Sequence, residues 1–280
     1  MFETIKFPLE WHALGREAQL AAELIAGGVT ALGAANHACQ GLYTQAFFGF
    51  AIGLERLAKL IIVADHAITH GGQFPDDKTL RKFGHALTAL LDACEPIIEK
   101  YASKAPDVKR PREPIHEGIV LTLDEFATLS RYYNLDLLVG GKASQLPEPI
   151  GAWWHRVGLP ILKRHYSEKA RQKDQAQAAA LQAIIGGRAA VLHHSEEGDF
   201  IGSVEALSAR AGATHVVQRY GRLYSLQIVR WLAEGISRIA HAGAYGQNLD
   251  ALMGLDEPFV LFLNEDHYFR SRKTWSIYRP

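Results

Sequence analysis

One long run without a charged side chain, residues 24–54, limits most strongly what this chain can fold into. The run is long enough to cross a bilayer as a helix. It also holds six glycines and a series of polar residues, namely Asn36, His37, Gln40, Thr44 and Gln45. Polar groups are costly in a lipid interior. The simpler interpretation is therefore a buried pair of helices joined by a glycine-rich bend, and we expect no membrane association.

Composition places the chain among globular proteins and sets aside several function classes. Of its 280 residues, 48% are hydrophobic and 21% are charged. Thirty basic residues balance thirty acidic ones, so binding to nucleic acid would need a local basic patch. Cys39 and Cys94 have no zinc-type spacing and are too few for a disulfide framework, which predicts a reducing, cytoplasmic environment. The N-terminal segment does not resemble a secretory signal. No nucleotide-binding glycine loop or hydrolase elbow is present, so we expect no cofactor.

Helical periodicity dominates the rest of the chain. We expect the first helix to stop at Gly27–Gly28, the third to begin at Pro75, and the fifth to bend at Pro160. The predicted helices cover residues 13–28, 43–72, 74–94, 122–141, 150–187 and 214–243. The expected fold is mainly α: a helical bundle over residues 1–145 and a helical region over residues 146–280, with the possibility of one shared core.

The C-terminal residues 258–278 change pattern and are rich in aromatic and β-branched residues, which predicts a β-hairpin. Arg270, Arg272, Lys273 and Trp275 lie in its second half. They could bind single-stranded nucleic acid through stacking and phosphate contacts. The alternative is an edge hairpin whose charges prevent aggregation.

Arg131 and Asn134 stand inside a helix with apolar residues on almost every side, so we expect that helix to be enclosed by others. The two residues are three positions apart and project in similar directions. An enclosed guanidinium needs a carboxylate, a group of carbonyls or a bound anion. Two interpretations remain open: a structural salt bridge to Glu55 or Asp92, and a site for a phosphate or a nucleic-acid backbone.

Residues 40–140 carry a set of features in a recognisable order. Glu55 and Lys59 lie in a long helix, a glycine-rich turn follows, and His85 then comes directly after a glycine and before the letters ALTALL. The segment SRYYNLDLL follows further along. This part of the chain resembles the HEPN family, whose helical domains are associated with nucleotide or RNA binding.

The resemblance implies a function and a site. Many members of the family are metal-independent ribonucleases or toxins, and their sites pair an arginine with a histidine, spaced R-x(4–6)-H, across a homodimer. Arg131 is not followed by a histidine at that spacing. The spacing occurs elsewhere, from Arg110 to His116, from Arg188 to His193 and His194, and from Arg210 to His215, which is about as often as chance predicts. The segment HHSEE that contains His193 and His194 has metal-ligand atoms, yet we interpret it as a solvated helix end.

If the chain cleaves RNA, Arg131 suits the role of a cation beside the phosphorane charge and His85 suits the base, with Asn134 in the same site. The alternative for His85 is a helix-packing histidine. The first hypothesis is thus an RNA-directed ribonuclease in a defence or toxin–antitoxin system. The second is a non-catalytic helical protein that binds a protein partner or a nucleotide.

Overall fold

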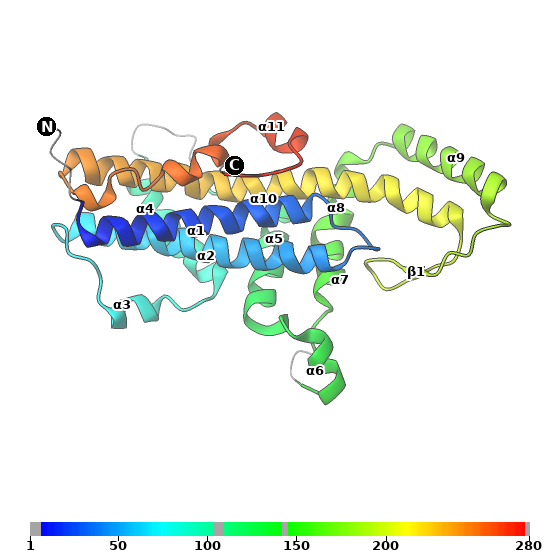
Figure 1. Ribbon diagram of the computed structural model, residues 1–280, viewed down its shortest axis with the longest axis horizontal. Helices are drawn as coiled ribbons and strands as arrows, with labels where there is room; N and C mark the ends of the chain where they lie inside the picture. The colour runs from blue at the N-terminus through cyan, green and yellow to red at the C-terminus, as the bar shows by residue number, and fades with distance from the viewer. Residues whose placement is uncertain (1–6, 103–108, 142–144, 278–280) are drawn as a thin grey trace, which may run out of the picture.

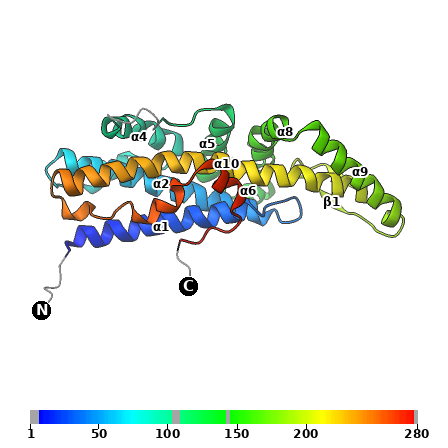
Figure 2. The same ribbon diagram turned by 90° about the horizontal axis from the view of Figure 1, so that it is seen from above.

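The computed structural model describes residues 7–102, 109–141 and 145–277. The fold is mainly helical, which confirms the expected class. Three long helices run side by side along the molecule (Figures 1 and 2): α1 (Leu9–Leu32), α2 (Gly41–Thr69) and α10 (Val204–Gly246).

The uncharged run forms the closely packed ends of α1 and α2, joined by a bend over residues 33–40, as the sequence predicts. The expected stop at Gly27–Gly28 is wrong, since α1 continues through both glycines. A side chain at Gly49 would lie 2.6 Å from the carbonyl oxygen of Leu24 and 2.9 Å from the Cα atom of Gly28. The glycines therefore let the two backbones approach each other instead of ending the helix. None of the described helices has the length and hydropathy needed to cross a membrane.

Residues 74–94 form two helices where the sequence predicts one: α3 (Asp77–Lys82) and α4 (Leu87–Tyr101). The break lies at Gly84, whose φ of +60° is a conformation that favours glycine. The Asp124 carboxylate accepts hydrogen bonds from the first amides of α4, at 2.8 Å from the nitrogen of Leu87. This contact fixes the start of the second helix.

The segment with Arg131 begins earlier than expected. It comprises α5 (Pro114–Glu125), a π-helical turn η1 (Phe126–Ser130) and α6 (Tyr133–Val139), which ends at Gly140 in the left-handed conformation. Figure 1 shows α6 projecting away from the bundle. Its residues are therefore not enclosed, contrary to our expectation.

The next part of the chain leaves the bundle and returns to it. The sequence predicts one bent helix here, but the chain forms several elements, with Ser167 capping α9. They are α7 (Pro149–Trp153), η3 (Trp154–Gly158), α8 (Leu159–His165) and α9 (Glu168–Ile185). A short antiparallel pair, β1 (His193–His194) and β2 (Phe200–Ile201), then leads into α10, with His193 opposite Ile201. Figure 1 shows α9 and β1 forming an arm beyond one end of the bundle.

The C-terminal β-hairpin predicted over residues 258–278 is not found in the described residues; the two-stranded sheet lies earlier in the C-terminal half. Its aromatic side chains, which suggested strands, instead pack into the core, because Phe259, Phe262 and Phe269 are fully buried. Residues 257–271 form η5 (Glu257–Leu263) and α11 (Asp266–Ser271), and a short turn, η4 (Asp250–Leu252), precedes them.

One core joins both halves of the chain. A single cluster of buried side chains extends from Leu14 in α1 to Trp275 near the C-terminus and includes Phe50, Trp154 and Ile236. The boundary expected near residue 145 therefore does not separate two hydrophobic cores. A smaller cluster under the β-hairpin consists of Val191, Ile201 and Val204.

Candidate functional site

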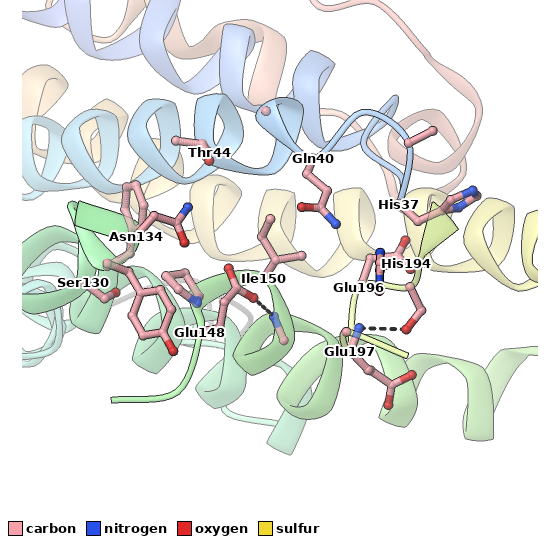
Figure 3. A pocket seen from close by; sticks show the side chains of 18 of the residues that line it. His37, Gln40, Thr44, Ser130, Asn134, Glu148, Ile150, His194, Glu196 and Glu197 are labelled. Atoms are coloured by element: carbon pink, nitrogen blue, oxygen red, sulfur yellow. Dashed lines mark hydrogen bonds between the residues drawn. The ribbon is translucent and has the colours of Figure 1, made fainter. Parts of the chain in front are cut away.

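A cavity of about 1010 Å³ lies where the bend before α2 meets α6, the start of α7 and the β1–β2 hairpin. Arg131 and Asn134 line it, as do three histidines, His37, His193 and His194. Figure 3 shows Asn134 at one end of this space and His37 and His194 at the other, with Gln40 pointing between them. We call it the histidine cavity.

The hairpin wall of the histidine cavity is tied to the bundle by a buried ion pair. The Glu196 carboxylate is fully buried and accepts hydrogen bonds from Nη2 and Nε of Arg210, at 2.7 and 3.0 Å. It also accepts one from the hydroxyl of Tyr43 in α2, at 3.2 Å. The guanidinium of Arg210 lies 4.0 Å above the ring of Trp154, a cation–π contact. Burial, followed by the Glu196 charge, raises the pKa of Tyr43, so this hydroxyl remains a donor.

His37 and His193 are in contact within the histidine cavity. Their ring centroids are 5.6 Å apart and their planes nearly perpendicular. The Nδ1 atom of His37 is buried and has no hydrogen-bond partner among the described residues. Burial lowers the pKa of His37, while the nearby Glu196 carboxylate opposes this shift. His37 is therefore neutral at neutral pH and able to accept a proton.

Arg131 is exposed, so our inference that it is enclosed is wrong. Its Nη2 atom donates to the carbonyl of Ala127 at 3.2 Å, and its guanidinium lies 5.3 Å from the ring of Phe48. It pairs with neither expected carboxylate: Glu55 pairs with other partners described below, and Asp92 pairs with Arg110 at 2.5 Å. The helix is apolar on almost every side, yet α6 projects from the bundle and its leucines are exposed.

His85 lies in a different place from Arg131. It lines a separate cavity of about 580 Å³ between α1, α2 and the turn that joins α3 to α4, together with Arg56 and Lys59. Its side chain is 79% exposed, and its Nδ1 atom lies 2.9 Å from the Glu55 carboxylate, which also pairs with Lys59 at 2.8 Å. The two residues that we expected to act together therefore belong to two cavities, and the structure provides no common site for them.

The C-terminal candidates differ in exposure. Trp275 is only 4% exposed, and its ring packs against Phe262, so it offers no free face for stacking on a base. Arg272 covers that ring at 5.2 Å and donates to the carbonyl of Thr274 at 2.8 Å. Lys273 is exposed, whereas Arg270 is half-buried. The predicted stacking by Trp275 is thus incompatible with its burial.

Sequence reasoning missed the wall of the histidine cavity that β1 and the turn after it form. HHSEE was interpreted as a solvated helix end, but it forms β1 and the turn after it, with Glu196 buried. The turn forms because the Ser195 hydroxyl accepts from the amides of Glu197 and Asp199, both at 3.1 Å. The metal-ligand atoms of HHSEE are visible in the sequence, but no local pattern indicated that the segment lines a cavity.

Among the described residues, no group of three or more acidic, histidine or cysteine side chains is arranged to hold a metal ion. Comparisons with protein-family models, with curated proteins and with solved structures gave no match for this chain.

Proposed function

We propose that the chain is an RNA-directed ribonuclease that acts in the histidine cavity and needs no metal ion for the bond-breaking step. The observation that carries the proposal is that Arg131 and Asn134 line the same cavity as the contacting pair His37 and His193. The resemblance to the HEPN family suggests the same chemistry. His85, which lies elsewhere, has no part in the proposed reaction.

The proposed reaction is a transfer within the RNA chain. His37, neutral at neutral pH, takes the proton of a 2′-hydroxyl, and the oxygen attacks the adjacent phosphorus. A protonated His193 or His194 gives its proton to the departing 5′-oxygen. The products are a 2′,3′-cyclic phosphate and a 5′-hydroxyl end. The Arg131 guanidinium stabilises the charge that develops on the phosphorane, and the Asn134 amide orients the phosphate.

An exposed Arg131 suits this role better than a buried one. A guanidinium locked to a carboxylate would have to break that pair before it could bind phosphate. Arg131 has only a carbonyl and an aromatic ring as its partners among the described residues. Its charge is therefore available to a phosphate in the cavity.

The test is cleavage of a panel of RNAs by purified protein in the presence of EDTA. We expect Arg131→Ala to reduce the rate by about 10²-fold or more, and His37→Ala by about 10²–10⁴-fold. His85→Ala is the matched control, since it removes an exposed histidine outside the cavity, and it should cleave like the wild type. Substrates with 2′-deoxy or 2′-O-methyl sugars should resist cleavage.

Two results would overturn the proposal: wild type and Arg131→Ala acting alike on every RNA, or products that carry a 5′-phosphate. The defence or toxin–antitoxin role is part of the same proposal. Induced expression of the wild-type chain should arrest growth, and His37→Ala should relieve the arrest.

A second candidate, a non-catalytic helical protein with a protein partner, is favoured by the surface of α6. Leu135, Leu138 and Val139 are 61%, 82% and 80% exposed, which is unusual for three neighbouring apolar residues on one short helix. The resemblance implies a homodimer, and we propose α6 as its interface. In that case sedimentation should show a dimer that Leu138→Asp dissociates, and a monomer at micromolar concentration would exclude the homodimer.

A further inference from the structure

The cavity that His85 lines combines apolar walls with cationic side chains, and neither proposed function uses it. Its volume of about 580 Å³ is typical of sites that hold small organic ligands. Two of its walls come from α1 and α2, and the third comes from the end of α3 and the turn that follows it. Figure 1 shows this third segment leaving the bundle after α2 and returning to it at α4. We call this space the α1–α2 cavity.

The register of α1 against α2 places a charged pair at one point of the α1–α2 cavity. The two helices run in opposite directions, because the bend over residues 33–40 joins them (Figure 1). Nη1 of Arg56 on α2 pairs with the carboxylate of Glu17 on α1 at 2.5 Å, and both residues line the cavity. Further along α2, the lining residues are Leu60 and Val63, on the same face of the helix as Arg56.

The lining of the two helices therefore becomes apolar beyond the charged pair. Leu60 is 3% exposed, and Leu14, which precedes the acidic partner on α1, is 9% exposed. Val63 is half-buried, and from Arg56 to Val63 the α2 backbone rises by about 10 Å. An apolar chain of similar length can be covered by this surface, and its removal from water favours binding.

The charged end of the α1–α2 cavity has hydrogen-bond donors that the protein does not fully use. Half-buried Lys59 donates to the Glu55 carboxylate at 2.8 Å, which occupies one of its three N–H groups. Arg56, also half-buried, contacts Glu17 through one of its three nitrogens. Glu17 is the one carboxylate among the described lining residues, and it is already paired, so a cationic ligand would face two cations there.

The rim of the α1–α2 cavity adds little to the hold on a ligand. Arg81 and His85 are 80% and 79% exposed, and they pair with Asp77 and Glu55, each at 2.9 Å. Neither of these two carboxylates lines the cavity. The three acids Glu17, Glu55 and Asp77 thus balance the three permanent cations Arg56, Lys59 and Arg81, so a dianion would leave a larger excess of negative charge than a monoanion.

We propose that the α1–α2 cavity binds a small amphipathic monocarboxylate. The carboxylate accepts hydrogen bonds from Lys59 and Arg56, and charge-assisted bonds of this kind are about twice as strong as neutral ones. The hydrocarbon chain lies along Leu14, Leu60 and Val63. The site is separate from the histidine cavity and does not depend on the proposed ribonuclease activity.

The first experiment is isothermal titration calorimetry of the full chain with sodium octanoate. We expect saturable binding to one site, and an affinity that rises up to about fourfold for each methylene added from butanoate to octanoate. Octanol and octylamine have the same chain without the carboxylate. Both should bind at least about tenfold more weakly than octanoate, because they lack the charge-assisted bonds.

Two variants test the two ends of the site. Lys59→Gln should weaken octanoate binding by about tenfold or more, whereas Lys82→Gln, with the same loss of charge outside the cavity, should bind like the wild type. Ala13→Glu places a carboxylate on the exposed α1 residue beside Leu14 and should abolish binding. Leu20→Glu, which adds the same charge at an exposed position of α1 outside the cavity, is its control.

The proposal is wrong if octanoate shows no saturable binding, or if octanol or octylamine binds as tightly as octanoate. It is also wrong if either folded variant, Lys59→Gln or Ala13→Glu, binds octanoate like the wild type. Should Lys59→Gln fail to fold, Ala13→Glu carries the same test, because Ala13 is exposed and its replacement leaves the ion pairs of α2 in place.

Discussion

Removal of the Glu196 carboxylate tests whether the buried ion pair holds the histidine cavity in shape. Glu196 is fully buried, while Arg210 is 18% exposed and keeps a second carboxylate, Glu197, at 3.3 Å. Breaking a fully buried pair costs about 3–5 kcal/mol, since the remaining charge loses its partner. Because Arg210 retains some solvent contact and Glu197, we expect Glu196→Ala to lower the free energy of unfolding by about 3 kcal/mol, the lower end of that range.

Two further variants provide losses of stability with which that of Glu196→Ala can be compared. Glu196→Gln keeps the size and an acceptor oxygen but loses the charge, so its effect should lie between those of the wild type and Glu196→Ala. Glu197→Ala removes the outer carboxylate, whose side chain is 21% exposed, and should cost about 1 kcal/mol or less.

The measurement is urea unfolding followed by circular dichroism, combined with hydrogen exchange of the hairpin amides. Glu196→Ala should both lower the unfolding midpoint and increase exchange at His193 and His194. The reasoning is refuted if Glu196→Ala and Glu197→Ala have equal effects, because the first would then not be a buried partner of Arg210.

Three further predictions concern packing and charge. Gly49→Ala should destabilise the chain by about 1–3 kcal/mol, because the added carbon meets the backbone of α1, whereas Gly41→Ala, with open space around it, should change the unfolding midpoint little. The pKa of His37 is lowered in the folded state, so the unfolded chain binds a proton at this residue more readily. The neutral His37 side chain therefore favours the folded state above pH 6.5, and this contribution is lost as the pH falls below that value. Stability measured from pH 7 to pH 5 should therefore decrease less steeply in His37→Gln. Trp275→Ala should cost about 3–5 kcal/mol on urea unfolding, while Lys273→Ala should be nearly neutral; equal effects would contradict the burial of the tryptophan.

The elements that the sequence predicted well are those whose signals are local. The long helix α2 ends at Thr69, next to the predicted stop at Gly71–Gly72, where both glycines adopt positive φ. The mainly helical class follows from periodicity, which needs no knowledge of distant contacts. The predicted helix end at Gly27 and Gly28 was wrong because glycine occurs both at helix ends and where two helices pack closely. The sequence of one helix cannot distinguish these two roles, since the second depends on the partner helix.

The sequence pointed to part of the candidate cavity. Arg131 and Asn134 line it, but His85, which we expected to act with them, lies in another cavity. The cavity wall that contains His193 and His194 comes from residues far along the chain from α2. It lies against the bundle because α10 packs there and because Glu196, in the hairpin, pairs with Arg210 of α10. Periodicity within one segment cannot predict this contact between the hairpin and the bundle, because the contact depends on how α10 packs against α1 and α2.

Arg131 and Arg222 show why local pattern misjudges burial. Both stand in helices with aromatic and aliphatic neighbours, and it was Arg131 that the sequence pattern led us to expect as enclosed. A helix that is apolar on every side is normally buried, but α6 extends past the bundle, so its leucines and its arginine are exposed together. Arg222 lies where α1 and α11 both cover α10, and burial there follows from the assembled helices.

The uncharged run that constrains the fold also limits what can meet Arg222, which forms no ion pair with the described residues. Residues 24–54 supply the end of α1, the bend and the start of α2, and none of them carries a carboxylate. The protein side that covers Arg222 at Gly33 can therefore offer only backbone dipoles. The same bend forms one wall of the histidine cavity, so the acidic side chains of that cavity, Glu148, Glu196 and Glu197, all come from other walls. Glu196 and Glu197 pair with Arg210, and Glu148 accepts a hydrogen bond from the amide of Gly151. Each acid near Arg131 thus already has a partner on its own side of the cavity.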